Sequence, residues 1–284
     1  MEKRVLGKTG ERVSVVAFGG IVVMRESQED ADRYVAEAVD RGVDYFDVAP
    51  TYDNAEERLG PALEPYRKDV FLACKTGKRD ADGVREEIEQ SLHRLRTDYV
   101  DLYQMHGIVS SDEVERILAP GGALEAFVEA REKGLARFLG FSAHSEEAAL
   151  TLIDAFDFDT VMYPVNYVTW LKGQFGHRLM RRANEKGMGV LALKALAQTQ
   201  WPEGGERTWP KCWYKPVDTP EEAALALRFT LERPVTAAVS PSHAELLWWM
   251  CDAADKLTPL TDAEMDHLRE LADSVVPIFG VENT

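Results

Sequence analysis

The sequence contains few cysteines and no long apolar run, and both shortages exclude classes of protein. Its three cysteines, Cys74, Cys212 and Cys251, are odd in number and far apart, so they indicate neither a disulfide framework nor a zinc site. No segment approaches the ~18 uninterrupted apolar residues of a membrane-spanning helix. The charged start, Met1 to Gly10, lacks the apolar centre of a signal peptide. We therefore expect a cytoplasmic protein without a metal site and without membrane contact.

Basic residues are also in short supply. The chain has 33 lysines and arginines against 49 aspartates and glutamates, which gives a formal net charge of -16. A field of this sign repels the phosphate backbone of nucleic acids, so we expect no nucleic-acid partner. It repels a phosphorylated cofactor as well, and such a ligand would need a local group of hydrogen-bond donors.

The composition and length fit one large globular unit. Hydrophobic residues make up 45% and charged residues 29% of the 284 positions, which is enough to bury a large core. A barrel of eight strand-helix units commonly has roughly 250 residues in one folding unit. No internal linker is evident, so we expect residues 1–284 to form a single domain, and the sequence carries no signal for an oligomeric state.

The order of the apolar runs predicts an α/β fold, a (β/α)8 barrel of the TIM type. Lys8-Thr9-Gly10-Glu11 lies between two short alternating runs and predicts an N-terminal hairpin. Short β-branched runs then alternate with longer charged segments of helical period, as in parallel strands joined by crossover helices. Eight such units favour a closed barrel over an open doubly wound sheet. The predicted strands are Val15–Phe18, Tyr45–Asp47, Val70–Lys75, Val100–Met105, Phe138–Ser142, Thr160–Met162, Val190–Leu193 and Ala237–Val239. The predicted helices are Glu29–Arg41, Ala55–Leu63, Gly83–Leu95, Leu124–Glu132, Ser145–Asp154, Phe175–Lys186, Pro220–Glu232 and Ala244–Ala254.

The remaining segments are assigned by composition and period. Thr199 to Thr219 is rich in Trp, Pro and Gly, and we interpret it as an irregular loop that covers the barrel mouth, packs on the exterior or meets a partner subunit. Trp170 is a second candidate for a substrate pocket. Thr261 to Val275 predicts an extra C-terminal helix outside the barrel, and Pro277 to Thr284 a tail.

Polar residues cluster where neighbouring strands of this barrel end, which is where barrel enzymes place their reactive groups. Asp47 ends the second predicted strand, Tyr52 follows in the next loop, Lys75 ends the third strand and His106 follows the fourth. Each has an ordinary interpretation when taken alone: a turn cap, a surface phenol, a snorkelling lysine, a satisfied histidine. Their joint placement on adjacent strand ends favours a shared site.

Together the four side chains suit the protonation of an oxygen. A phenol with a pKa of about 10 is a weak acid, and an ammonium such as Lys75 should ease its proton donation by stabilising the phenolate. A buried ammonium needs a partner, which Asp47 can supply. His106 could hold and polarise a carbonyl oxygen beside Tyr52.

These residues resemble the catalytic motifs of the aldo-keto reductases. The similar segments are Phe18-Gly19-Gly20, Asp47-Val-Ala-Pro-Thr-Tyr52, Lys75-Thr, Gln104-Met-His106, Gly140-Phe-Ser142-Ala-His144 and Ala192-Leu-Lys194-Ala-Leu, the last like the Met-Lys variant of some bacterial members. The resemblance implies hydride transfer from NADP, or NAD, to the carbonyl carbon of a small molecule, with Tyr52 as the acid. It also implies cofactor contacts from Gly20, Ile21, Asp47, Ser142, Met162, Leu193, Lys194, Ser240 and Ser242.

The chain departs from the family pattern in two places. Met162 stands where many members have Gln, and Leu193 where many have an aromatic ring. After the last predicted strand, the segment Val239 to Trp249 has no Lys or Arg, although family members usually use one for the adenosine 2'-phosphate. Phosphate could still be bound by Ser240, Ser242 and the following helix start, and charge could come from Lys194, Lys211 or Lys215.

The motifs of several other enzyme classes are missing from the sequence. There is no Walker loop, no GxGxxG and no complete nucleophile elbow, and His177 and His243 have no partners at metal-ligand spacing. A regulatory barrel that binds a nicotinamide nucleotide with little turnover is the alternative from a different class. An isomerase or aldolase in which Lys75 forms a Schiff base is a third hypothesis.

Overall fold

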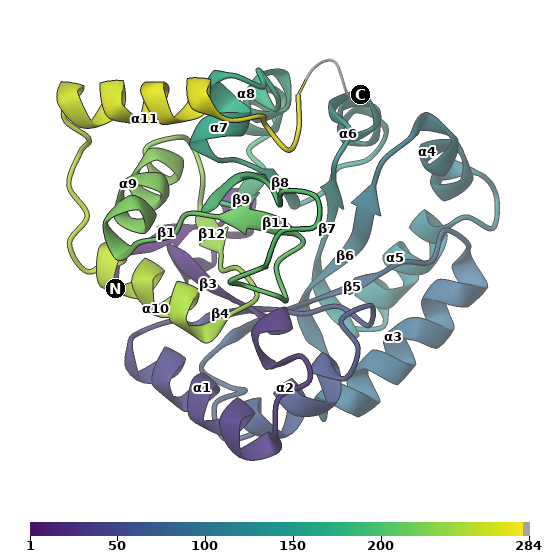
Figure 1. The fold of residues 1–284 in the computed structure, drawn as a ribbon. Coiled ribbons are helices and arrows are strands. Elements are labelled where there is room, and N and C mark those ends of the chain that lie inside the picture. The colour runs from purple at the N-terminus through teal and green to yellow at the C-terminus, as the bar shows by residue number, and fades with distance from the viewer. Residues whose placement is uncertain (281–284) are drawn as a thin grey trace.

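The computed structural model describes residues 1–280 and contains a closed barrel of eight parallel strands (Figure 1). Neighbouring strands pair in chain order, and the last strand closes the ring by pairing with the first. The barrel strands are β3 (Val16–Gly19), β4 (Tyr45–Asp47), β5 (Phe71–Thr76), β6 (Val100–Ile108), β7 (Ala136–Ala143), β8 (Thr160–Pro164), β9 (Gly189–Leu193) and β12 (Ala237–Val239).

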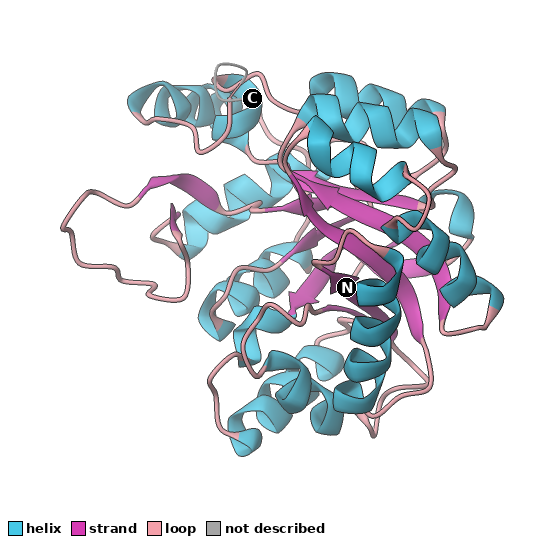
Figure 2. Cartoon of the chain, turned by 90° about the vertical axis from the view of Figure 1, so that its right-hand side faces the viewer, coloured by secondary structure: helices cyan, strands magenta, loops and turns pink. Residues whose placement is uncertain are grey.

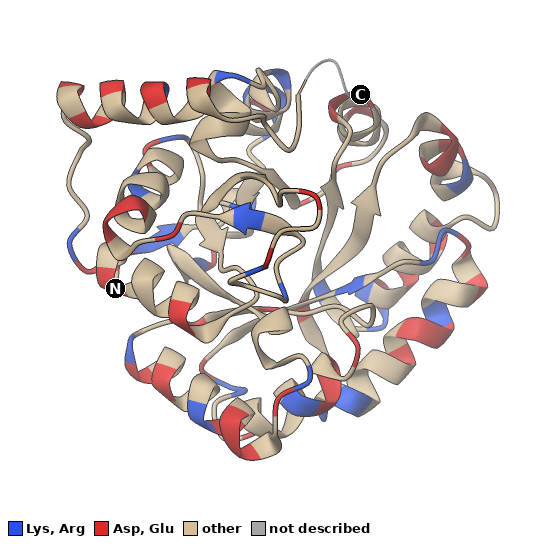
Figure 3. Cartoon of the chain, viewed as in Figure 1, with Lys and Arg blue, Asp and Glu red and all other residues tan. Residues whose placement is uncertain are grey.

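Helices surround the barrel and connect its strands, so the predicted (β/α)8 architecture is confirmed. Figure 3 shows the charged residues mostly on these outer helices, while the central ribbon is mainly uncharged. None of the helices in residues 1–280 combines the length and apolarity that a bilayer crossing requires. The helices are α1 (Gln28–Asp40), α2 (Ala55–Leu63), α3 (Ala81–Leu95), α4 (Ser111–Leu118), α5 (Ala123–Glu132), α6 (Glu146–Ala155), α7 (Tyr167–Leu171), α8 (His177–Glu185), α9 (Pro220–Leu231), α10 (Ala244–Ala254) and α11 (Asp262–Ser274).

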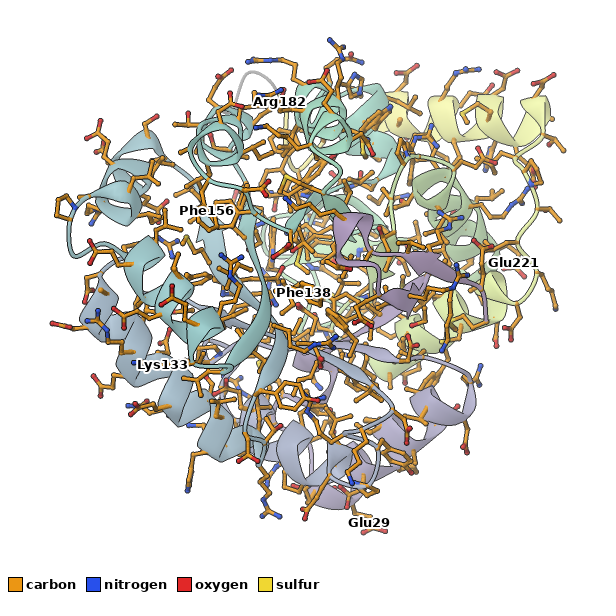
Figure 4. The ribbon with its side chains drawn as sticks, turned by 180° about the vertical axis from the view of Figure 1, so that it is seen from behind. Glu29, Lys133, Phe138, Phe156, Arg182 and Glu221 are labelled. Atoms are coloured by element: carbon orange, nitrogen blue, oxygen red, sulfur yellow. The ribbon has the colours of Figure 1, made fainter. Side chains whose placement is uncertain are left out.

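Alternation along the strands divides the core into two parts. Successive strand residues point to opposite faces, so Tyr45 belongs to the cluster inside the barrel, whereas Phe46 packs in the larger layer between strands and helices. The predicted hairpin, β1 (Lys3–Val5) with β2 (Arg12–Ser14), is confirmed. Its Leu6 is fully buried and joins the inner cluster. Figure 4 shows this hairpin across the rear end of the barrel, near Phe138, so the site must lie at the opposite end.

The contact between the hairpin and β9 makes a stability prediction. Gly7 has a φ of +51°, and a Cβ atom there would lie 2.1 Å from the backbone nitrogen of Gly189. We expect Gly7→Ala to lower the free energy of unfolding by about 3 kcal/mol, because it adds a clash with rigid backbone to left-handed strain. Urea unfolding followed by circular dichroism measures the change.

Gly10 is the matched control for this prediction. It also has a positive φ, +77°, but a Cβ atom would meet nothing within 4 Å. Gly10→Ala should therefore cost only the conformational strain, about 1 kcal/mol. Equal losses of stability in the two variants would show that hairpin packing against β9 is not what makes Gly7 necessary.

The structure corrects several segment assignments. The segment from Thr199 to Thr219 was predicted as an irregular loop, which holds for residues 201–213 but not for its ends, where β10 (Ala197–Gln200) and β11 (Tyr214–Pro216) form an antiparallel pair. Two short helices, α4 and α7, were not predicted. In Figure 2 the β10–β11 pair and the loop that connects its two strands project from one end of the barrel.

The C-terminal segment is packed in the part that the structure describes. The predicted extra helix is confirmed as α11. The following residues were predicted as a tail, but Ile278 is 8% exposed and the ring of Phe279 stacks on His144 at 5.1 Å. Residues 281–284 of the predicted tail lie outside the described residues.

Candidate active site

A cavity of about 200 Å³ opens at the carboxyl ends of the barrel strands. Gly19, Asp47, Leu193 and Val239, which line it, are the last residues of β3, β4, β9 and β12. The surface has other hollows, but this one collects the polar side chains that the sequence singled out. The predicted site residues that line it are Ile21, Asp47, Tyr52, His106, Leu193, Lys194, Ser240 and Ser242.

A buried ion pair forms the floor of this cavity. The ammonium of Lys75, 1% exposed, donates to the Asp47 carboxylate and to the carbonyl oxygen of Val48 at 3.2 Å. The second Asp47 oxygen accepts a hydrogen bond of 3.1 Å from Gln104 Nε2. Burial alone would lower the pKa of Lys75, but the Asp47 carboxylate and the Tyr52 phenol together outweigh it, so the pKa lies above its ordinary value. Burial raises the pKa of Asp47, and Lys75 opposes that rise. Lys75 therefore carries its positive charge at neutral pH.

Tyr52 lies above this ion pair. Lys75 Nζ is 5.4 Å from the centre of the Tyr52 ring, and the ring meets His106 edge-on with centres 5.7 Å apart. As expected, the charge of Lys75 acts to lower the pKa of the phenol, but it is not the largest influence on that pKa. Burial raises the pKa of Tyr52 above its ordinary value, and the charge of Lys75 reduces the rise without reversing it. Tyr52 thus keeps its proton at neutral pH.

His106 completes the group as a neutral imidazole. The sequence predicted His106 just after a strand that ends at Met105, but β6 continues to Ile108, and its pairing with β7 shifts register between Met105 and Ile108. Burial, with the positive charge of Lys75, lowers the pKa of His106 to about 3. Its Nδ1 lies 3.2 Å from the hydroxyl of Thr51. If the hydroxyl donates to Nδ1, the ring proton is on Nε2, where it is free to be donated.

The buried histidines predict a loss of stability in mild acid. His144, whose pKa burial also lowers to about 3, lies near His106. The unfolded chain binds protons below a pKa of about 6.5, but the folded protein does not, so the stability present above that pH is lost progressively as the pH falls towards 3. From pH 7 to pH 5 we expect the free energy of unfolding to fall by about 1–2 kcal/mol for each histidine.

Urea unfolding at the two pH values measures this change. Replacing both histidines by Gln should remove that part of the pH dependence, whereas His93→Gln, which alters an exposed residue of α3, should retain it. Identical slopes in the wild type and the double variant would contradict neutral, buried imidazoles.

The predicted cofactor residues divide into two groups. Gly20, Ser142 and Met162 do not line the cavity. The others do: Ile21, Asp47, Leu193, Lys194, Ser240 and Ser242. Ser142 Oγ accepts a hydrogen bond of 2.7 Å from the Gly107 backbone nitrogen. Met162 is fully buried and packs in the inner cluster beside Leu102. The structure therefore places Met162 in the barrel core and not at the cavity wall.

The opposite side of the cavity carries donors suited to phosphate. Ser240 and Ser242 stand just before α10, whose N-cap residue, His243, makes no side-chain capping bond. Free backbone N–H groups at a helix start favour anions. The donor set thus fits the phosphates of a dinucleotide, although it lacks a cation. Lys211 donates to Glu26 and Val22, and Lys215 pairs with Asp218 at 2.7 Å, so neither is free in this arrangement.

The β10–β11 connection covers part of this side of the site. Its Lys211 backbone nitrogen donates to His243 Nε2 at 3.1 Å, and its Trp209 ring lies 5.6 Å from that of Trp249 on α10. Trp213 and Tyr214 line the cavity. The loop therefore covers part of the barrel mouth, which was one of the three placements predicted for it. Trp170 does not line the cavity, and its ring lies against that of His177, with centres 4.0 Å apart and planes tilted by 41°.

His144 also belongs to this site, although the sequence patterns predicted no role for it. Its Nε2 lies 2.9 Å from Lys194 Nζ, and both side chains line the cavity. Its place in Gly140-Phe-Ser142-Ala-His144, two residues after the predicted cofactor contact Ser142, was the available signal. No group of three potential metal ligands occurs within residues 1–280.

Comparisons with known proteins agree with this arrangement. The sequence profile of the Aldo/keto reductase family matches residues 16–273. L-galactose dehydrogenase from Arabidopsis thaliana is 31% identical over 231 residues, which cover 74% of this chain and 70% of that protein. An uncharacterized oxidoreductase, YqkF, from Bacillus subtilis is 34% identical over 157 residues, which span 50% of this chain and only 49% of that relative. The structure of aldo-keto reductase AKR11C1 from Bacillus halodurans, in its holo form, superposes with a TM-score of 0.76 at 26% identity, covering 98% of both chains.

Proposed function

Because the chain belongs to the aldo/keto reductase family of oxidoreductases, we propose that it reduces an aldehyde or ketone with NADPH or NADH and that Tyr52 is the general acid. The observation that carries the proposal is the buried Lys75–Asp47 pair beneath Tyr52, at a cavity that His106 also lines. This arrangement sets a protonated phenol beside a fixed positive charge.

The four side chains have distinct tasks in this proposal. His106, neutral at physiological pH, donates from Nε2 to the carbonyl oxygen and holds it next to the phenol. Tyr52 transfers its proton to that oxygen as negative charge develops there. Lys75 stabilises the phenolate that remains, and Asp47 keeps the lysine charged and in place.

The cofactor would lie along the side of the cavity between β9 and β3. Ile21, Leu193, Ser240 and Ser242 line that side and would hold it. When bound, the nicotinamide supplies a hydride to the carbonyl carbon. The absence of Lys and Arg from Val239 to Trp249 leads us to propose that the preference for NADPH over NADH is weak.

Two experiments test the function itself. Quenching of tryptophan fluorescence by each cofactor measures binding, and the loss of cofactor absorbance with a panel of aldehydes and ketones measures turnover. We expect both cofactors to bind and at least one carbonyl compound to be reduced. Failure of both cofactors to bind would remove the oxidoreductase proposal.

A nucleotide-binding regulatory barrel is the second candidate, and the uncharged phosphate side of the cavity is the observation that favours it. It predicts cofactor binding without turnover of any compound in the panel.

The Schiff-base hypothesis is less well supported, because Lys75 is charged and paired with Asp47, and a protonated amine is not a nucleophile. Borohydride trapping of a carbonyl compound on Lys75 would support it nonetheless.

A further inference from the structure

A second buried lysine, Lys194, lines the same cavity, and the family resemblance implied that it contacts the cofactor. Lys194 follows β9 in a left-handed conformation, with a φ of +60°. It is 9% exposed, and its Nζ lies 2.9 Å from His144 Nε2. Within residues 1–280 no carboxylate lies within 4.0 Å of this nitrogen, in contrast to Lys75. A buried ammonium without a counter-ion is costly, so the site is suited to receive an anion.

Aromatic rings surround the Lys194 ammonium on its other sides. Nζ lies 5.6 Å from the centre of the Trp213 ring and 5.3 Å from that of Phe279. Cation–π contacts of this kind recover part of the cost of burial. They do not recover all of it, because burial lowers the pKa of Lys194 to about 7. A ligand with a negative charge would supply the missing compensation.

The direction of the side chain indicates which ligand that is. In the barrel order β7-β8-β9-β12, Lys194 leaves β9 and reaches His144 after β7, so it leans away from β12 and from Ser240 and Ser242. Its charge also acts on His106, where it contributes to the lowered pKa of that ring. Lys194 therefore faces the side of the cavity where the carbonyl compound would be held, and not the phosphate side.

We propose that Lys194 binds a carboxylate of the substrate, so that the substrates of this protein are aldehydes or ketones that carry a carboxylate group. The inference rests on the proposed reductase function and names its substrate class. A monoanion fits better than a phosphate dianion, since His144 is neutral when Lys194 is charged and the pair thus offers one positive charge. Phosphate sites commonly use several donors or a bidentate arginine.

Matched pairs of aldehydes test the proposal. The 3- and 4-carboxybenzaldehydes differ from their methyl esters in charge and little in shape. At about pH 6, below the pKa of Lys194 near 7, we expect kcat/KM to favour each acid over its ester by about tenfold or more. Lys194→Gln should abolish this preference and Lys194→Arg should restore it. Because the result is the ratio of kcat/KM for the acid to kcat/KM for the ester, a loss of activity that affects both substrates equally does not change it.

The control variant is Lys215→Gln. It removes the same charge from β11, at a side chain paired with Asp218 outside the cavity, and should leave the acid-to-ester ratio unchanged. An equal ratio in the wild type and Lys194→Gln would overturn the proposal. So would an equal effect of Lys215→Gln, because a distant field would then explain the preference.

A binding measurement separates failure of this inference from failure of the reductase function. Calorimetric titration with benzoate, which cannot react, should show binding to the wild type and at least tenfold weaker binding to Lys194→Gln, with no such difference for benzamide. If no aldehyde is reduced but benzoate binding depends on Lys194, the proposed function fails and the carboxylate site stands. If the wild type and Lys194→Gln bind benzoate equally, the proposed carboxylate site is wrong, whether or not any aldehyde is reduced.

Discussion

Replacing Tyr52 with Phe is expected to lower kcat for carbonyl reduction by about a thousandfold. The substitution removes one hydroxyl and keeps the ring, whose edge-on contact with His106 at 5.7 Å should persist. Lys75, paired with Asp47, cannot replace the phenol as a proton donor, because its charge is held by the carboxylate. Steady-state assays with an aldehyde from the panel measure the loss.

Two controls make this result specific to proton donation. Cofactor affinity, followed by fluorescence, should change little in Tyr52→Phe, since the ring remains. Tyr45→Phe alters a tyrosine of β4 that lies inside the barrel and whose hydroxyl has no hydrogen-bond partner within residues 1–280, so its kcat should stay within about twofold of wild type. Comparable turnover in Tyr52→Phe and the wild type would mean that another group donates the proton.

Lys75→Met should have the largest combined effect on stability and activity. It leaves the Asp47 carboxylate, 1% exposed, without its positive partner. Removing one member of a buried ion pair typically costs about 3–5 kcal/mol. Turnover should fall as well, by about a hundredfold or more, because no positive charge remains to stabilise the Tyr52 phenolate.

The double variant Asp47→Asn/Lys75→Met separates the two effects. It removes both charges together, so we expect it to regain most of the stability, as measured by urea unfolding. Activity should stay low, because the phenolate is still unsupported. If the double variant were active, the ion pair would serve folding alone; if it were as unstable as Lys75→Met, the coupling of Asp47 to Lys75 would be weaker than their contact suggests.

The barrel and the grouping of Asp47, Tyr52, Lys75 and His106 could be predicted from sequence because both follow from one regularity. Apolar runs of strand length recur between charged helical segments, and parallel strands bring their carboxyl ends to one face. A residue at a strand end is therefore placed in space by its position in the pattern. The resemblance to aldo-keto reductases rested on the same strand-end positions.

The missed elements are short or lack such a pattern. Helix α7 has only 5 residues, too few for a helical period to be recognised. The β10–β11 pair lies among Trp, Pro and Gly residues without alternation. Helix α4, however, begins with a capping box between Ser110 and Glu113, a signal that is visible in the sequence.

Charge effects in the site depended on burial, which the sequence does not give directly. Lys75 acts on the Tyr52 pKa in the expected direction, but desolvation raises that pKa by more, so the net shift is upward. The contact of Lys194 with His144 joins residues fifty positions apart through side-chain direction, and strand-end position alone could not have specified it.

The fate of the cofactor hydrogen tests the account most directly. An aldehyde can be reduced with NADPH that carries deuterium at the reactive C4 position of the nicotinamide, and the alcohol analysed by mass spectrometry and NMR. We predict one deuterium on the former carbonyl carbon, none on its oxygen after exchange with water, and formation of the labelled product about a thousandfold slower in Tyr52→Phe. Alcohol without deuterium on that carbon, or equally fast labelling in Tyr52→Phe, would contradict it.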